Sequence, residues 1–208
     1  MSVLRRQPDW ESLYFYQKSQ VLYQLTFVFA QRYLKRGDRT IDQMVQAARS
    51  GKQNIVEGSA DGVTSTEMEL KLMNVARSSI KELKEDYEDY LISRQLKLWQ
   101  KNHPRYAQMV EFCKTHNKLE DYQPYFDKWN DEEIANIALS LCHFIDKMMT
   151  SYEAHLQKTF VEEGGIKERM TAARLGYRNN QKEEITRLQQ ENAKLQEELE
   201  LLKKDKQG

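Results

Sequence analysis

The sequence predicts an all-α fold, an up-and-down four-helix bundle with a C-terminal helical suffix and a short coiled coil. Apolar residues recur every three or four positions over several long stretches, as in amphipathic helices. Only 8 Gly and 3 Pro occur in 208 residues, too few for a fold with frequent turns. Strand patterns are absent from the sequence. We expect the bundle at residues 10–160 with an irregular insertion at about 95–130, the suffix helix at 161–180 and the coiled-coil tail at 181–208.

The first two helices are predicted on either side of a short turn. The first extends over about residues 10–36, with Asp9 as its N-cap. It ends at Gly37-Asp38, because glycine readily leaves the helical conformation. The second helix extends over about residues 40–57. Gly58 is expected in the left-handed conformation that often ends a helix, followed by a turn at "SADG".

A third helix and an irregular insertion follow this turn. The pair Thr64-x-x-Glu67 is typical of a capping box at the start of a helix. The apolar pattern then continues to about Arg94 and weakens beyond it. For the insertion, we expect a short helix over about residues 103–113 and an ordered, tyrosine-rich loop at "EDYQPYFDKW".

The fourth long helix begins at a second capping signal. Asn130-x-x-Glu133 marks its start, and its apolar stripe continues to about Phe160. Gly164-Gly165 is expected to end it. The following "IKERMTAARLGYR" predicts a short basic helix, and Asn179-Asn180 suggests a joint before the last segment.

The last segment has the seven-residue pattern of a coiled coil. Its Asn192 at an a position favours a parallel two-stranded coil, in which Glu198 and Lys203 would pair between chains. The alternative is a single solvated helix, which would leave the leucines of the seam in water. At about three heptads the coil is marginal alone and would depend on the bundle or on a tethered partner. The seam is Ile185, Leu188, Asn192, Leu195, Leu199 and Leu202.

The stretch "QAARSGKQNIVEG" at residues 46–58 superficially resembles a phosphate-binding loop. That motif requires Gly where Gln46 stands and Ser or Thr where Gln53 stands, and it follows a strand, so we reject it. A helix explains the small residues better, because they let a neighbouring backbone approach closely. Gly51 costs up to about 1 kcal/mol of helix propensity, which implies a packing reason for it.

A second stripe on the same helix lies beside its apolar face. Its members follow one another at helical spacing, which places them on one side. Asn54 and Glu57 would need hydrogen-bond partners if they were buried, and Arg77, Ser78 and Ser79 are the partners we expect on the next helix. The stripe is Gln43, Ala47, Ser50, Asn54 and Glu57.

Two segments together resemble a known family. "DQMVQAARSGKQNIVEGS", followed by "TSTEMELKLMNVARSSIKELKEDYEDYL", is similar to the bacterial four-helix bundle family first noted as proteins encoded in ribosomal RNA intervening sequences. The closer likeness is to the four-helix bundle suffix branch, whose suffix resembles "FVEEGGIKERMTAARLGYR". The likeness covers about residues 12–178. The matching motif residues are Gln43, Ala47, Ser50, Gly51, Asn54, Glu57, Gly58, Ala76, Ser79 and Glu82.

The resemblance implies an up-and-down bundle that often assembles as a pentamer. A distant cousin, the accessory variability protein of diversity-generating retroelements, binds nucleic acid and a reverse transcriptase through basic surfaces. No established activity comes with the suffix branch. A pentamer and a two-stranded tail differ in symmetry, so the pentamer that the resemblance implies and the dimer that the coil predicts both stay open.

The sequence offers no catalytic or metal-binding pattern. Cys113-x-x-His116 and Cys142-His143 are poorly spaced for zinc, because adjacent helical side chains point about 100° apart. Core cysteines and surface histidines are the simpler interpretation. Neither the Glu-x-x-His pair of di-iron bundles nor a serine nucleophile elbow occurs. We expect no enzyme activity, no metal, no cofactor and no small-molecule substrate.

Composition and charge indicate a cytoplasmic protein without a membrane partner. Lys+Arg and Asp+Glu both number 32, so the whole chain has no net charge to attract nucleic acid or a membrane. Two cysteines do not make a disulfide framework and are expected to be reduced. The first residues lack the apolar core of a signal peptide, and no apolar stretch is long enough to span a bilayer.

A local basic cluster at the first inter-helix turn suggests a function. Such clusters are also common as solvated helix ends, where the helix dipole favours cations. We hypothesise a non-enzymatic oligomeric protein that binds RNA, DNA or a nucleic-acid-processing enzyme through this cluster. The alternative is a protein–protein scaffold or adaptor multimerised by the coiled coil. The basic residues are Arg32, Lys35, Arg36, Arg39, Arg49 and Lys52.

Overall fold

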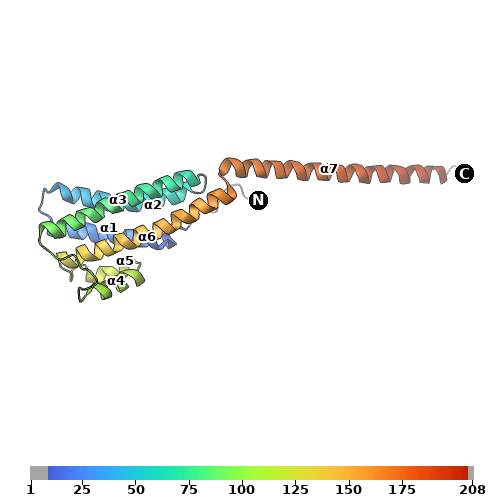
Figure 1. Cartoon of the computed structure of the whole chain (residues 1–208). Coiled ribbons are helices and arrows are strands. Elements are labelled where there is room, and N and C mark those ends of the chain that lie inside the picture. The colour runs from blue at the N-terminus through green and yellow to red at the C-terminus, as the bar shows by residue number, and fades with distance from the viewer. Residues whose placement is uncertain (1–8, 206–208) are drawn as a thin grey trace. The chain divides into compact units, whose positions relative to one another are not determined.

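The computed structural model describes residues 9–205, apart from the side chains of residues 202, 204 and 205. Its regular elements are all helical, and the described residues contain no strand (Figure 1). The all-α class is therefore confirmed. The elements are η1 (Trp10–Ser12), α1 (Tyr14–Tyr33), α2 (Arg39–Asp61), α3 (Thr66–Ser93), α4 (Tyr106–Thr115), α5 (Leu119–Tyr122), η2 (Gln123–Tyr125), α6 (Asp131–Glu163) and α7 (Ile166–Asp205).

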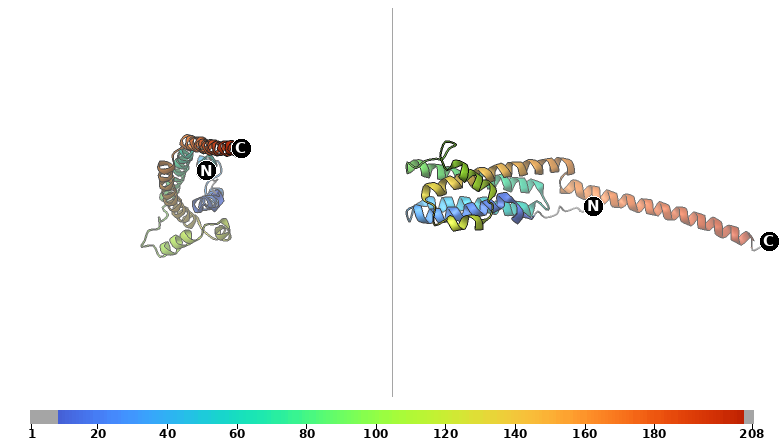
Figure 2. Two further views of the ribbon diagram at one scale, coloured as in Figure 1. Left: turned by 90° about the vertical axis from the view of Figure 1, so that its right-hand side faces the viewer. Right: turned by 90° about the horizontal axis from the view of Figure 1, so that it is seen from below.

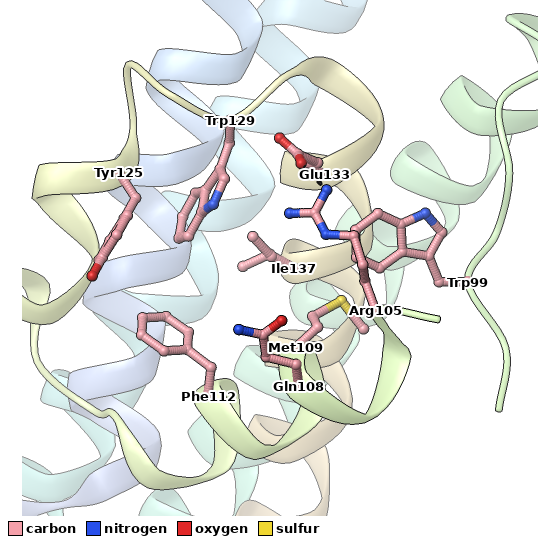
Figure 3. Close-up of a pocket in the computed structure, with 9 residues that line it drawn as sticks. All are labelled: Trp99, Arg105, Gln108, Met109, Phe112, Tyr125, Trp129, Glu133 and Ile137. Carbon is pink, nitrogen blue, oxygen red and sulfur yellow. Dashed lines mark hydrogen bonds and ion pairs between the residues drawn. The ribbon is translucent and has the colours of Figure 1, made fainter. Parts of the chain in front are cut away.

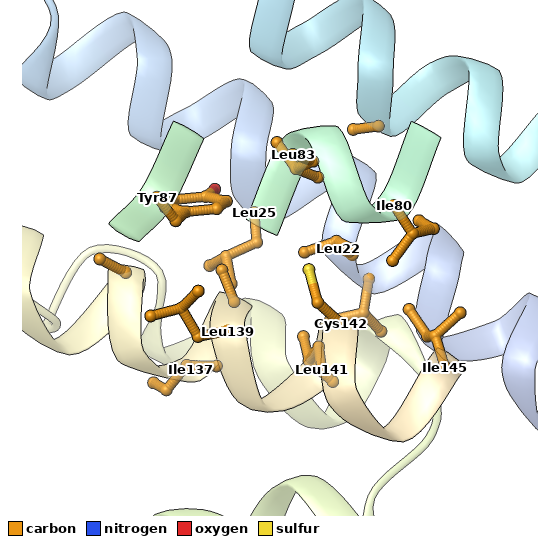
Figure 4. Close-up of a cluster of buried hydrophobic side chains, with 14 of the residues drawn as sticks. Leu22, Leu25, Ile80, Leu83, Tyr87, Ile137, Leu139, Leu141, Cys142 and Ile145 are labelled. Carbon is orange, nitrogen blue, oxygen red and sulfur yellow. The ribbon is translucent and has the colours of Figure 1, made fainter. Parts of the chain in front are cut away.

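The chain divides into two compact units. We call residues 9–162 the helical body and residues 163–205 the tail. In the body, α2 lies along both α1 and α3 (Figure 2). Side chains from α1, α3 and α6 meet in one apolar core, in which Leu22, Leu83 and Leu141 have no exposed surface (Figure 4).

Polar and aromatic pairs give the directions of the helices that enclose this core. Tyr90 donates a hydrogen bond to Asp131 at 3.0 Å, and the Tyr152 hydroxyl donates to Glu69 at 2.7 Å. Residue numbers therefore rise along α3 while they fall along α6, so these two helices are antiparallel. On α1, the Phe29 ring lies edge-on to Tyr90, with ring centroids 4.7 Å apart.

Small residues bring α2 and α3 close together. A Cβ atom at Gly51 would lie 2.7 Å from the Ile80 side chain, so the expected packing reason for this glycine is confirmed. The prediction that Gly58 ends its helix in the left-handed conformation is wrong. Gly58 lies inside α2 and is buried, and a Cβ atom there would meet Leu72 at 3.2 Å. Close helix packing, rather than helix termination, therefore explains both glycines.

The predicted first helix is too long at both ends. Residues 10–12 form the short helix η1, and Leu13 is extended before α1 begins. The Asp9 side chain makes no cap hydrogen bond, and its backbone carbonyl accepts bonds from Ser12 instead. At the other end Leu34 is extended, which ends α1 before the predicted boundary. Periodicity alone does not show such local changes in backbone conformation.

One of the two predicted capping boxes is confirmed. The Asn130 side chain accepts from the Glu133 N–H, and the Glu133 carboxylate accepts from the Asn130 N–H, both at 2.9 Å. At the start of α3 the cap is Ser65, which accepts from the Met68 N–H at 3.1 Å. The predicted cap Thr64 lies one position too early. Serine and threonine are both good caps, so composition cannot choose between neighbours.

The insertion between α3 and α6 is held against α1 by a buried lysine. Lys18 is 2% exposed, and its ammonium donates to the carbonyls of Cys113 and His116 at the end of α4. Burial lowers the pKa of Lys18 to about 8. The carbonyls at a helix C-terminus carry partial negative charge, so the lysine complements the end of α4. The expected short helix is α4, and the tyrosine-rich loop contains α5 and η2.

The tail is one continuous helix. Gly164 has a φ of 71° and separates α6 from α7, as predicted. The predicted joint at Asn179-Asn180 is wrong, because α7 continues through both residues, and the predicted suffix and coiled-coil segments therefore fall within one helix. The side chain of Leu202 lies outside the described residues. The other seam leucines, with Ile185, are exposed on α7: Leu188, Leu195 and Leu199.

Candidate nucleic-acid interface

Three exposed cations lie where α1 ends and α2 begins. They are Lys35, Arg36 and Arg39, from the predicted basic cluster. Between them Asp38 caps α2 by accepting a hydrogen bond from the Thr40 N–H at 2.9 Å. That hydrogen bond lowers the pKa of Asp38, and so does the positive charge of Lys35. Apart from Asp38, this turn presents positive charge.

A fourth cation, absent from the prediction, joins this turn from α3. Arg94 is exposed at the C-cap of α3, and its guanidinium lies 4.9 Å from the Tyr90 ring centroid. Because the Tyr90 ring also contacts Phe29 near the end of α1, Arg94 lies near the α1–α2 turn, where its charge lowers the pKa of Asp38. Sequence reasoning missed Arg94 because the approach of two helix ends cannot be seen in one helix's pattern. We call Lys35, Arg36, Arg39 and Arg94 the end cluster.

Arg32 does not belong to the end cluster as a free cation. It donates a hydrogen bond to the Phe126 carbonyl at 2.6 Å and forms an ion pair with Asp127. Both partners lie in the insertion, so Arg32 ties α1 to this segment. These contacts engage the Arg32 guanidinium within the chain, and its predicted role in nucleic-acid binding stays a prediction.

Arg49 and Lys52 also lie apart from the end cluster. Ten residues of α2 separate Arg39 from Arg49, which is about 15 Å along a helix. Arg49 is exposed, whereas Lys52 is half-buried with its ammonium 4.6 Å from the Tyr23 ring centroid. Burial, and to a smaller extent the charge of Arg49, lowers the pKa of Lys52. Lys52 thus covers α1 rather than extending a cationic surface.

The structure brings several of the motif residues together in a groove between α2 and α3. Ser50 and Ser79 share a hydrogen bond at 2.9 Å across the two helices. Ala76, beneath them, is fully buried, and its carbonyl lies 3.6 Å from the Cβ position of Gly51. The predicted residues that line the groove are Gln43, Ala47, Ser50, Ser79 and Glu82.

The other members of the stripe do not form the expected bonds between helices. Asn54 donates to the Ser50 carbonyl of its own helix at 2.9 Å, and Glu57 is exposed. Arg77 turns instead to α6, where it pairs with Asp146 at 2.9 Å and Glu153 at 2.8 Å. The prediction of partners on α3 for Asn54 and Glu57 is therefore wrong.

An aromatic pocket in the insertion is the feature that sequence reasoning missed. Its volume is about 190 Å³. Met109 and Ile137 contribute apolar surface to it (Figure 3). The signal in the sequence is the density of aromatic residues after residue 95, but their spacing follows no single helix. The aromatic side chains of the pocket are Trp99, Phe112, Tyr125 and Trp129.

An ion pair fixes the polar side of this pocket. Arg105 pairs with Glu133, and its guanidinium lies 5.0 Å from the Trp99 ring centroid. Glu133 is held in turn by the Asn130 capping box. The arginine is half-exposed, whereas the Glu133 side chain is 12% exposed. A guanidinium has five N–H donors, so Arg105 retains donors for a further acceptor.

The pocket is attached to the same end of α1 that carries the end cluster. The Tyr33 hydroxyl in the last turn of α1 donates to the Trp129 carbonyl at 3.2 Å. Arg32, one position earlier, holds the neighbouring residues of the insertion. Lys35 and Arg36 follow Tyr33 by two and three residues, in the turn after α1. Positive charge and aromatic surface therefore lie near one another at this end.

The sulfur and imidazole groups do not assemble into a metal site in the described residues. Cys113 and Cys142 are both buried and without a disulfide. Burial raises the pKa of Cys113 to about 11 and that of Cys142 to about 12, which keeps both thiols protonated at neutral pH. Within the described part of the chain, no group of three or more His, Cys, Asp or Glu side chains is suitably placed for a metal ion.

Comparisons with protein-family models, with curated proteins and with solved structures find no match for this chain. The helices between residues 9 and 205 include none that is both long and apolar enough to cross a membrane. Three features of the described residues bear on function: the end cluster, the aromatic pocket and the exposed seam of α7.

Proposed function

We propose that the protein is a non-enzymatic, oligomeric helical-bundle protein that binds nucleic acid through the end cluster. The observation that carries this proposal is that four exposed cations, Lys35, Arg36, Arg39 and Arg94, lie at neighbouring ends of α1, α2 and α3. Across residues 9–205, none of the four has a carboxylate within ion-pair distance, so their charge is open to a ligand. A nucleic-acid-processing enzyme that holds RNA or DNA is the related partner class.

Such a cluster would contact phosphates rather than bases. Binding should therefore be indifferent to sequence and should release counterions. With about four phosphate contacts, the affinity for duplex should fall about 100-fold between 50 and 200 mM salt. One cluster binds weakly, but an oligomer repeats it around a symmetry axis and gains avidity.

Fluorescence anisotropy with labelled structured RNA and duplex DNA tests the proposal. The variant combines Lys35→Ala, Arg36→Ala and Arg39→Ala, and the matched control removes the exposed charges of Lys71, Lys81 and Lys147 elsewhere on the body. We expect the first variant to lose about tenfold or more in affinity at 50 mM salt and the control to lose little. Equal losses, or no binding of the unchanged protein at 50 mM salt, would contradict the proposal.

The finer architecture is part of the same proposal. We infer that α1, α2, α3 and α6 form an up-and-down four-helix bundle of the bacterial family that the sequence resembles. The antiparallel pairing of α3 with α6 and the close packing of α2 on α3 support it. The buried, unpaired cysteines support a cytoplasmic location. An experimental structure in which α6 runs parallel to α3 would contradict the bundle.

A scaffold role is the second candidate, because the seam of α7 is exposed. The g positions of its heptads are all glutamate: Glu184, Glu191 and Glu198. An antiparallel pair would bring g positions of both chains together and set like charges against each other, so the parallel pair with a second copy of α7 is favoured. The e positions, which face g in a parallel pair, carry no acid.

Light scattering on the full chain and on a chain that ends at Asn180 tests this assembly. We expect the full chain to be an oligomer at micromolar concentration, as a dimer through α7 or as a pentamer through the body. Loss of the oligomer on truncation would assign assembly to α7. An unchanged oligomer would assign it to the body and leave α7 for another partner, and a monomeric full chain would contradict assembly altogether.

A further inference from the structure

The aromatic pocket has the size of a site for one ring system. Pockets for drug-sized ligands measure about 300 to 1,000 Å³, whereas this pocket measures about 190 Å³. This volume accommodates one planar ring system, on its own or as one ring of a longer chain.

The walls of the pocket favour a flat ring over an aliphatic group. Tyr125 stacks on one side of Trp129 with an angle of 16° between the ring planes and 5.4 Å between centroids. Ile137, Met109 and Arg105 lie toward the other side of the indole, around the pocket (Figure 3). A ring that enters there stacks on Trp129, which already has its opposite face supported. Indole faces are strong stacking surfaces for nucleobases.

The polar groups of the pocket require a ligand with hydrogen-bonding edges. Arg105 is anchored by Glu133 and Trp99 and still has unused N–H donors. The exposed Gln108 amide lines the same pocket and offers both a donor and an acceptor. A cationic ligand is disfavoured because the Arg105 guanidinium already occupies the aromatic surface. A nucleobase has both the flat faces and the polar edges that these groups recognise.

Positive charge near the pocket provides for the phosphates that accompany such a base. The Lys128 ammonium lies 5.3 Å from the Tyr125 ring centroid at the pocket wall. Tyr33 joins the pocket to the last turn of α1, which Lys35 and Arg36 of the end cluster follow. We propose that the pocket takes one unpaired base of single-stranded nucleic acid whose backbone lies along the end cluster. This inference rests on the proposed function and adds a preference for single strands.

The preference has a physical reason. A base in a duplex is stacked and paired, and it must be extruded at a cost before it can enter a pocket. A single strand avoids this cost and gains the stacking on Trp129. The proposal therefore predicts that the bases, and not only the phosphates, contribute to affinity.

The decisive test changes the ligand and leaves the protein intact. Anisotropy at 50 mM salt compares a labelled 12-nucleotide homopolymer with an abasic strand of equal length and charge, and with a duplex. We expect the base-bearing strand to bind about tenfold more tightly than the abasic strand, and more tightly than the duplex. Trp129→Leu should abolish the difference between base-bearing and abasic strands, whereas the control Trp10→Leu should retain it. Thermal melts establish that both variants fold.

The outcomes separate this inference from the proposed function. Equal binding of base-bearing and abasic strands, still dependent on the end cluster, overturns the pocket as a base site and leaves phosphate binding in place. If the protein binds none of the nucleic acids, both the base site and the proposed function are wrong. If the oligonucleotides leave the tryptophan fluorescence of the protein unchanged, while a short peptide ending in phenylalanine quenches it in the unchanged protein but not in Trp129→Leu, the pocket belongs to a protein ligand and the inference fails. If Trp129→Leu does not fold, the comparison of strands with the unchanged protein still decides.

Discussion

The same residue type has opposite surroundings in the helical body and in the tail. Leu22 and Leu25 have no exposed surface in the body, whereas Leu188 and Leu195 of the tail are 46% and 54% exposed. Both sets recur at helical spacing in the sequence. The contrast shows that periodicity predicts the position of an apolar stripe but says nothing of what covers it.

The number of neighbouring helices within each unit explains the contrast. In the body, α2 lies along α1 and α3, and apolar side chains of α6 join those of α1 and α3 in one core. In the tail, α7 is the one helix among residues 163–205, and none of its described side chains is buried. Stability in the body therefore comes from packing inside the chain, whereas the described residues of the tail provide no second helix to cover its seam.

Matched leucine truncations should give the largest difference in stability between the two units. Leu22→Ala removes a fully buried side chain from the core and should lower the free energy of unfolding by about 2 to 5 kcal/mol. Leu188→Ala should leave the unfolding of the body unchanged and weaken only the assembly through α7. Urea unfolding followed by circular dichroism, together with light scattering, measures both. A similar loss of body stability in the two variants would show that α7 packs on the body.

A second comparison removes one arginine from an ion pair in each unit. Arg77→Met leaves Glu153, whose side chain is 10% exposed, without its cation. The other carboxylate oxygen of Glu153 has no hydrogen-bond partner in residues 9–205, so the charge depends on Arg77. We expect a loss of about 2 to 3 kcal/mol, less than for a fully buried pair because Asp146 remains partly exposed.

The tail control for this prediction is Arg187→Met. Arg187 pairs with Glu184 on the surface of α7, and both side chains are more than half exposed. Surface pairs of this kind contribute about 0.5 kcal/mol or less. Thermal melts of the two variants should therefore differ clearly. Equal shifts would mean that the Arg77 network is solvated in solution.

Glycines in the two units provide a third comparison. Gly51→Leu forces bulk against Ile80 and should cost about 1 to 3 kcal/mol or more, whereas its neighbour Lys52→Ala should cost less. Gly176 in α7 has no atom within 4 Å of its Cβ position. Gly176→Ala should therefore strengthen the tail helix by up to about 1 kcal/mol. Melts of Gly51→Leu and Lys52→Ala with equal, small shifts would contradict the close packing of α2 on α3.

Alkaline pH should have the smallest effect on the free energy of unfolding, and this effect should be confined to the body. The folded-state pKa of Lys18 is lowered to about 8, so from pH 8 toward 10.5 the unfolded chain binds more protons and the free energy of unfolding rises with pH. The raised pKa values of Cys113 and Cys142 act in the opposite direction above about pH 9, because there the folded chain keeps protons that the unfolded chain loses.

The net result is a modest rise in stability between pH 8 and 9 that gives way to a fall. Lys18→Met should remove the rise and keep the fall. Urea midpoints at pH 7, 8, 9 and 10 for both proteins measure this. Parallel curves for the two proteins would show that Lys18 does not titrate in this range.

Local sequence rules account for much of the body. The long helices follow from apolar spacing, and the capping box at Asn130 and the packing of Gly51 follow from side-chain chemistry. The prediction for Gly58 is wrong because a glycine can either end a helix or allow close helix packing, and the sequence does not distinguish the two. The prediction of a joint at Asn179-Asn180 is wrong because asparagine disfavours a helix only weakly, and the helix-forming residues on both sides outweigh this preference.

The pocket and the composition of the end cluster could not be obtained in this way. Trp99 and Trp129 lie outside the regular elements, in different connecting segments, and Arg105 is the N-cap of α4. Their meeting depends on how the insertion folds against α1, through contacts such as that of Lys18. Likewise, the pairing of Arg32 with Asp127 joins positions far apart in the chain, beyond the reach of local periodicity.

The order of helices along the chain has a consequence for synthesis. The last buried residue in the described body is Leu156, and the seam of α7 begins at Ile185. About 50 residues follow Leu156, and ribosomes need about 3 to 10 s to add them. Small helical domains fold in milliseconds or less. Each body therefore folds before its seam is complete, so the proposed assembly through α7 would join bodies whose cores have already closed.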